Sequence, residues 1–60
     1  MDIRKQLLTE HSKPNTELIT KYIGHHQERF DILMTLFLQD ESRVTQRAAW
    51  VVGEVVRKYP

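Results

Sequence analysis

The chain has 60 residues, enough for one small domain, and a chain of this size buries only about 60% of the surface that its unfolded form exposes. It has no cysteine, which excludes disulfide bridges and thiolate zinc sites. Nine Lys or Arg against eight Asp or Glu give a net charge of +1, and charges this evenly balanced do not indicate a nucleic-acid or anionic-membrane partner. The longest apolar runs hold about five residues, far short of the roughly 20 that span a bilayer, and the N-terminus has no apolar signal region, so we expect a cytoplasmic protein without membrane contact.

A first helix is predicted over residues 2–11. Asp2 places a negative charge at the helix start, where the helix dipole favours it. Ile3, Leu7 and Leu8 form a short apolar stripe, and Lys13 and Pro14 are expected to end the segment. Because the apolar stripe is short, this helix is expected at one end of the fold, with one face in water.

A second helix is predicted over residues 16–23. Asn15 is the expected N-cap, and Glu17 adds a favourable charge in the first turn. Gly24 suits a left-handed residue just after the helix. The apolar residues at helical spacing are Leu18, Ile19, Tyr22 and Ile23.

A third helix is predicted over residues 26–39, and it is apolar over a broad arc. Its main stripe consists of Phe30, Leu33, Met34 and Phe37. The stripe is widened by Ile32, Leu36 and Leu38. Asp40 and Glu41 follow as a polar turn.

A fourth helix is predicted over residues 42–59, with Ser42 as its N-cap. Apolar residues recur at positions 44, 48, 51, 52, 55, 56 and 59, which are helical spacings of three and four. Ala49 and Trp50 lie off this stripe, so the apolar arc is wider than one neighbouring helix needs. Gly53 costs about 1 kcal/mol relative to Ala within a helix, and a close helix crossing is the expected compensation. Pro60 is expected to end the helix.

The last two predicted helices resemble a HEAT repeat, an antiparallel helix pair that stacks into curved solenoids. The resemblance covers residues 30–60 and rests on Asp40, Val44, Ala48, Val52 and Gly53. The segment V-T-Q-R-A-A-W also resembles sequences of small uncharacterised bacterial HEAT-like proteins. The chain departs from the pattern in two places, because Thr45 stands where an Arg is usual and the turn is about one residue short. Arg43 or Arg47 is therefore the expected substitute in the Asp–Arg ladder that links HEAT units.

The fold class expected from these elements is all-α, with two antiparallel helical hairpins stacked right-handedly as a HEAT-like α-solenoid fragment in a single domain, residues 1–60. The first helix is polar enough to cap such a stack, whereas the third and fourth are broadly apolar. Because repeat arrays need polar caps at both ends, the chain is either the N-terminal part of a longer solenoid or pairs with another molecule.

Residues able to carry catalysis or hold a metal are sparse. His25 and His26 are adjacent, so on a helix they diverge by about 100° and chelate poorly; we interpret them as residues of a helix start. Glu28 and Asp31 are best explained as charges that complement the helix dipole. No nucleophile with a base can be assembled, so we expect neither an enzyme nor a cofactor, although catalytic residues could lie elsewhere if the chain is a fragment.

The favoured function is a non-catalytic protein-interaction or scaffold module, which binds a partner or itself through the apolar faces of the third and fourth helices. Packing in the core or at a repeat interface is the expected role of Trp50, and a partner-facing position is the alternative. The candidate contact residues are Trp50, Val52, Val56 and Tyr59.

The alternative function is nucleic-acid binding through a basic stripe on the fourth helix. The stripe would consist of Arg43, Arg47, Arg57 and Lys58 and would contact phosphates. A resemblance to the HEAT-like alkylpurine DNA glycosylases, which use a basic concave face on DNA, implies the same possibility. The chain has no aromatic residues interleaved with these cations, so a solvated face is the preferred interpretation.

Overall fold

The computed structural model describes residues 1–59, and these form four helices joined by short turns. The helices are α1 (Ile3–Thr9), α2 (Lys13–Ile23), α3 (Gln27–Gln39) and α4 (Ser42–Lys58). The described residues contain no strand, so the predicted all-α class is confirmed.

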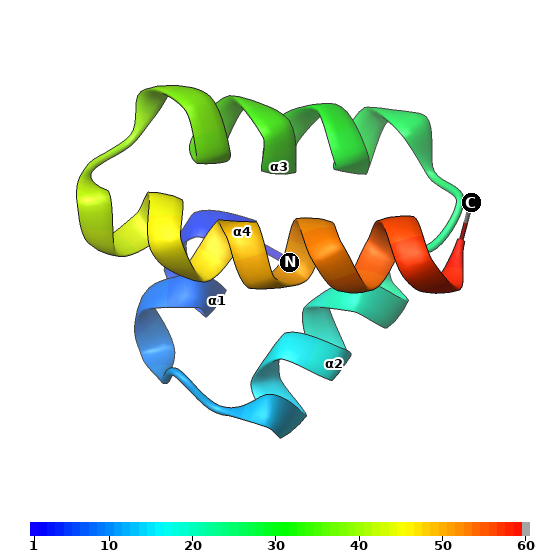
Figure 1. The fold of residues 1–60 in the computed structure, drawn as a ribbon, viewed down its shortest axis with the longest axis horizontal. Coiled ribbons are helices and arrows are strands. Elements are labelled where there is room, and N and C mark those ends of the chain that lie inside the picture. The colour runs from blue at the N-terminus through cyan, green and yellow to red at the C-terminus, as the bar shows by residue number, and fades with distance from the viewer. Residues whose placement is uncertain (60) are drawn as a thin grey trace.

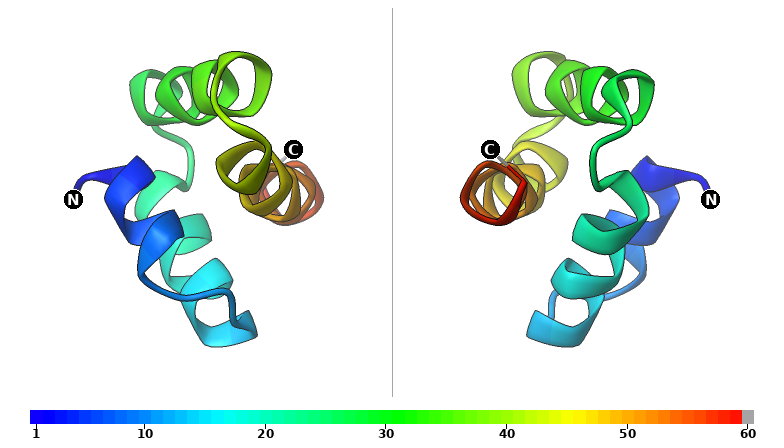
Figure 2. Two further views of the ribbon diagram at one scale, coloured as in Figure 1. Left: turned by 90° about the vertical axis from the view of Figure 1, so that its left-hand side faces the viewer. Right: turned by 90° about the vertical axis from the view of Figure 1, so that its right-hand side faces the viewer.

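Helix α4 is the centre of the molecule, because it contributes four of the nine core residues, more than any other helix. α3 runs beside it in the opposite direction, while α1 and α2 lie together on its other side (Figures 1 and 2). The stripe of α4 that faces inward consists of Val44, Ala48, Val51 and Val55. The core is completed by Ile3, Leu7, Ile19, Ile23 and Leu33. All nine residues belong to the apolar stripes that the sequence pattern predicts.

Helix α2 begins three residues earlier than the predicted boundary. Ser12 is its N-cap, and the Ser12 hydroxyl accepts a hydrogen bond from the Asn15 amide at 3.2 Å. Pro14 therefore lies in the first turn of α2, where a missing N–H costs nothing, rather than after the end of α1.

Asn15, predicted as a helix cap, is instead a buried polar residue that is 7% exposed. Its side-chain oxygen accepts a hydrogen bond from the Gln6 amide group at 2.7 Å. Its side-chain nitrogen donates to the carbonyl oxygens of Gln6, at 2.9 Å, and Glu10, at 2.8 Å. One side chain thus satisfies carbonyl groups at the end of α1, which α1 itself leaves without partners.

Two expectations for α4 are wrong. Ser42 is the first helical residue rather than the cap, and Glu41 occupies the cap position without a side-chain hydrogen bond. Gly53 is exposed, and an added Cβ would meet no atom within 4 Å, so no helix crosses closely there. Gly24, in contrast, follows α2 with a φ of 46°, as its predicted position requires.

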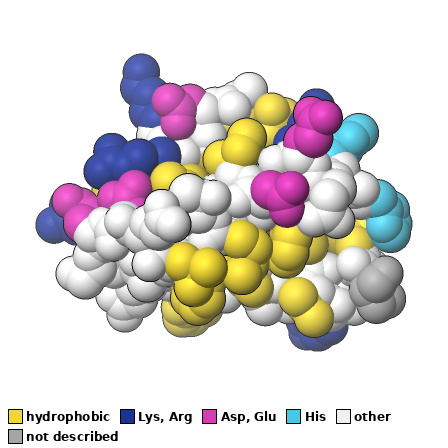
Figure 3. Space-filling view, turned by 90° about the horizontal axis from the view of Figure 1, so that it is seen from above, with side chains coloured by type: hydrophobic (Ala, Val, Ile, Leu, Met, Phe, Trp, Pro, Cys, Tyr) yellow, Lys and Arg dark blue, Asp and Glu magenta, His cyan; other side chains and the backbone are white. Residues whose placement is uncertain are grey.

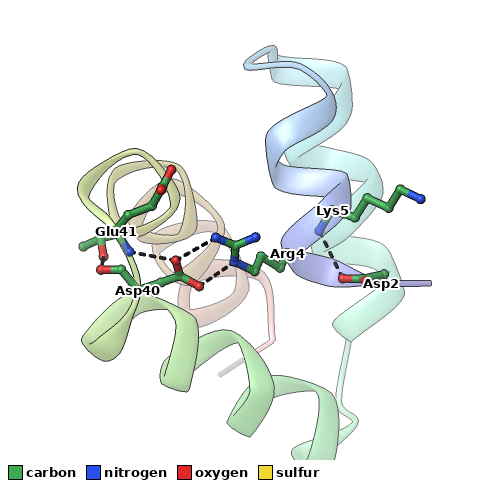
Figure 4. A network of polar contacts seen from close by, with 6 residues as sticks. Asp2, Arg4, Lys5, Asp40 and Glu41 are labelled. Carbon is green, nitrogen blue, oxygen red and sulfur yellow. Dashed lines mark hydrogen bonds and ion pairs between the residues drawn. The ribbon is translucent and has the colours of Figure 1, made fainter.

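A bidentate ion pair joins α1 to the turn between α3 and α4 (Figure 4). The Arg4 guanidinium donates from Nε to Asp40 Oδ2 at 2.7 Å and from Nη2 to Asp40 Oδ1 at 3.2 Å. The hydrogen bond from Arg4 holds the pKa of the Asp40 carboxyl below its usual value, and the Glu41 amide adds to the effect. The partner of Asp40 is therefore Arg4 and not Arg43 or Arg47, the substitutes expected from the HEAT pattern.

Candidate interaction surface

Two rows of apolar side chains, one on α3 and one on α4, lie beside the contact between these helices, and Phe30 of the first row lines the same groove as Val56 and Tyr59 of the second. We call these seven residues the seam: Phe30, Met34 and Leu38 from α3, with Ala49, Val52, Val56 and Tyr59 from the C-terminal part of the chain. Spacings of three and four keep each row on one side of its helix. Viewed from above, hydrophobic side chains form a row across this part of the surface (Figure 3).

The seam is partly in the core and partly in solvent. Phe30 and Val52 pack against the buried cluster. Leu38 is 69% exposed and Val56 is 57% exposed. These two side chains lie toward opposite ends of the seam, because α3 and α4 are antiparallel, and less exposed apolar residues lie between them. A continuous apolar surface is typical of interaction sites.

A groove of about 330 Å³ lies at the end of the seam near the α2–α3 turn. The His25 ring stands edge-on to the Tyr59 ring, with centroids 4.8 Å apart and an interplanar angle of 88°, so Tyr59 is held against this turn. The groove is lined by Gly24, His25, His26, Gln27, Phe30, Val55, Val56 and Tyr59.

Trp50 lies on a different side of α4 from the other three predicted contact residues. It is 60% exposed, so of the two packing roles expected for it, in the core or at a repeat interface, the core role is wrong. Its ring meets the His11 ring edge-on, with centroids 5.4 Å apart. Together with Lys13, Glu17 and Glu54 it borders a second pocket, of about 270 Å³, at the start of α2. Val52, Val56 and Tyr59 share the seam, whereas Trp50 belongs to a second surface.

Three of the four cations in the predicted basic stripe already have partners within the chain. The Arg47 guanidinium donates to the Leu7 carbonyl oxygen at 2.8 Å and so caps the end of α1. Arg57 and Lys58 share Glu54, at 2.5 Å and 3.6 Å. The hydrogen bond from Arg57 lowers the pKa of Glu54. Arg43 is exposed at the start of α4.

The histidines are divided between two surfaces. His25 and His26 border the groove, while His11 contacts Trp50. Within residues 1–59, no three His, Asp or Glu side chains come together in a metal-binding arrangement. In the same part of the chain, no helix has the length and apolar character needed to cross a bilayer.

The sequence prediction included the apolar face of the third helix in the binding surface but named no contact residue on it. Phe30, Met34 and Leu38 are spaced by four residues, a signal that places them on one side of the helix. This spacing was not sufficient to predict which residues of α3 are exposed, because the sequence of a broadly apolar helix does not show which side its neighbours leave in solvent.

Comparisons of this chain with protein-family models, with curated proteins and with solved structures found no match.

Proposed function

We propose that this chain is a non-catalytic helical interaction module, which binds a protein partner or a second copy of itself through the apolar faces of α3 and α4. The observation that carries the proposal is the seam, where Leu38 and Val56 are each more than half exposed and Val56 borders a groove. Burying apolar surface contributes about 25 cal/mol per Å², so covering such residues favours association.

The proposal includes a HEAT-like organisation, with α1–α2 and α3–α4 as two hairpins of a right-handed solenoid fragment. It is supported by the opposite directions of α3 and α4, which lie side by side (Figure 1). In such a stack α1 and α2 would close one end, and the seam would receive the next hairpin or a partner helix.

Nucleic-acid binding through Arg43, Arg47, Arg57 and Lys58 is the less supported alternative. A phosphate would have to compete with the Leu7 carbonyl oxygen for Arg47 and with Glu54 for Arg57 and Lys58. The net charge of +1 also provides little long-range attraction for a polyanion.

The proposed function is tested with a charge placed on the seam. Val56→Glu introduces a carboxylate on α4, and Gln46→Glu introduces the same group at another exposed position of α4 outside the seam. We expect Val56→Glu to weaken self-association, or binding of proteins retained from an extract of the native cell, at least tenfold, about 1.4 kcal/mol. Gln46→Glu should leave both unchanged.

Circular dichroism of both variants checks that helicity is preserved, because both positions are exposed. Equal retention and equal self-association by the wild type and Val56→Glu would contradict the proposal.

A further inference from the structure

A second surface of α4 is centred on Trp50, the only tryptophan of the chain. Five residues of α4 recur here at spacings of three and four, so they lie on one side of the helix. We call these residues the Trp50 surface: Arg47, Trp50, Glu54, Arg57 and Lys58. Because Trp50 is exposed and does not pack in the core, these cations do have an aromatic residue among them, contrary to the expectation from the sequence.

The pocket of about 270 Å³ lies between the Trp50 surface and the first turns of α2. A cavity of about 150 Å³ holds a benzene ring, so the pocket has room for one phenylalanine side chain. The indole ring of Trp50 supplies an apolar wall, and its edge-on contact with His11 holds it beside the α1–α2 turn. Tryptophan is among the residues that contribute most to binding at protein interfaces, so an apolar side chain packed on this ring is the expected occupant.

The charges along the Trp50 surface leave positive charge at both of its ends. At one end the Arg47 guanidinium donates to a neutral group, the Leu7 carbonyl oxygen, so its charge is not compensated. A guanidinium has five N–H donors, so Arg47 can keep this bond and bind a carboxylate as well. At the other end Arg57 and Lys58 share the single carboxylate of Glu54, which leaves one positive charge in excess.

The other charges around the pocket occur as neighbours of opposite sign. Lys13 and Glu17 both line the pocket and are four residues apart on α2. Arg43 and Glu41 are two residues apart at the start of α4. The Glu10 carboxylate accepts a hydrogen bond from the hydroxyl of the α2 N-cap, where the positive end of the helix dipole offsets part of its charge. The positive ends of the Trp50 surface therefore stand out against a balanced background.

We propose that the Trp50 surface binds a peptide segment of a partner protein in which one apolar side chain is flanked on both sides by carboxylates. The apolar side chain fills the pocket against the Trp50 ring, one carboxylate pairs with Arg47, and the other pairs with Arg57 or Lys58. Arg47 and Arg57 are ten residues apart, about 15 Å along α4, and an extended peptide spans that distance with about five residues. This surface is separate from the seam, so the inference goes beyond the proposed function.

Single-stranded nucleic acid is the other ligand that combines stacking on an aromatic ring with negative charge. It fits this surface less well, because it carries a phosphate at every nucleotide. The phosphates next to a base in the pocket would lie beside Glu17 and Glu54, which line it. A peptide needs carboxylates only at the two positive ends, so the pattern of charge favours a peptide.

The experiment follows the emission of Trp50 while the peptide acetyl-G-E-D-A-F-A-D-E-G-amide is added to the full chain. Because the chain has one tryptophan and the peptide has none, the signal reports this site alone. We expect a saturable blue shift as the peptide covers the indole ring. Two control peptides, one with Ser in place of Phe and one with Gln and Asn in place of Glu and Asp, should bind at least about tenfold more weakly.

Variants are compared by fluorescence anisotropy of the same peptide with a fluorescein label. Trp50→Ala should raise its dissociation constant at least about tenfold, and Arg57→Gln about threefold, because an exposed ion pair contributes little. Lys5→Gln is the matched control, since it also removes one positive charge but lies on α1 with its side chain pointing away from α4 (Figure 4). It should bind the peptide like the wild type. All three positions are exposed, so helicity by circular dichroism should be preserved.

Four results would overturn the inference: no saturable change in Trp50 emission, equal binding of either control peptide, equal weakening by Lys5→Gln and Arg57→Gln, or tighter Trp50-dependent binding of oligothymidine than of the acidic peptide. The last result would assign the surface to single-stranded nucleic acid.

Val56→Glu distinguishes this inference from the proposed function, because Val56 belongs to the seam and does not line the pocket. It should bind the acidic peptide like the wild type. If the wild type does not bind the peptide while Val56→Glu loses association through the seam, the inference falls and the proposed function stands. If the peptide binds while Val56→Glu alters no other association, the proposed function falls and the inference stands.

Discussion

Gly53 has a different expected role in the sequence, where it predicts a close helix crossing, than in the fold, where it is exposed. A glycine within a helix costs about 1 kcal/mol relative to Ala, and here nothing lies within 4 Å of the missing Cβ. We therefore expect Gly53→Ala to raise the free energy of unfolding by about 1 kcal/mol, measured by urea denaturation. Gly24→Ala is the contrasting variant, because its φ of 46° is unfavourable for a residue with a Cβ, and it should destabilise by about 1 kcal/mol or more. Destabilisation by Gly53→Ala would mean that another helix approaches this position.

At the scale of the elements, the Asp40 carboxylate links the α3–α4 turn to Arg4 of α1. Its folded-state pKa is lowered, chiefly by the hydrogen bond from Arg4, so its contribution to stability is complete above the ordinary carboxyl pKa of about 3.9. That contribution is lost as the pH falls through the lower, folded-state value. Because the pair is exposed, the effect on global stability should be small.

We expect Arg4→Gln to reduce the loss of stability as the pH falls below about 4, measured as the pH dependence of the urea midpoint. It should also speed amide hydrogen exchange in α1 at neutral pH, since the side-chain link to the α3–α4 turn is gone. Arg57→Gln is the control, because it removes the main cause of the lowered pKa of Glu54 within α4 and should leave exchange in α1 unchanged. Equal exchange in α1 for the wild type and Arg4→Gln would show that the ion pair does not hold this helix.

At the scale of the whole molecule, the charge distribution predicts weak interaction with nucleic acids. The wild type should show no salt-dependent binding to duplex DNA in fluorescence anisotropy at physiological ionic strength. The matched variants are Arg43→Ala/Arg57→Ala on α4 and Lys5→Ala/Lys21→Ala, two exposed cations on α1 and α2. Steep salt-dependent binding by the wild type that only the α4 variant loses would support the nucleic-acid alternative instead.

The sequence by itself determined the helices and the buried face of α4. Val44, Ala48, Val51 and Val55 recur at helical spacing, and the phase of that stripe is the same whichever neighbour covers it. Boundaries were less certain, because Pro14 is compatible both with the end of one helix and with the first turn of the next.

Only the tertiary structure decided which part of each broad apolar arc stays in solvent. Trp50 and Val56 both belong to the apolar arc of α4, yet they face different surfaces, because α1 and α2 cover one side of α4 and α3 the other. The hydrogen-bond partners of Asp40 and Asn15 could not be predicted from the sequence either, since Arg4 is 36 residues from Asp40 and Gln6 is nine residues from Asn15. The physical reason is common to these cases: periodicity is a property of one segment, whereas exposure and long-range pairing depend on which segments meet in space.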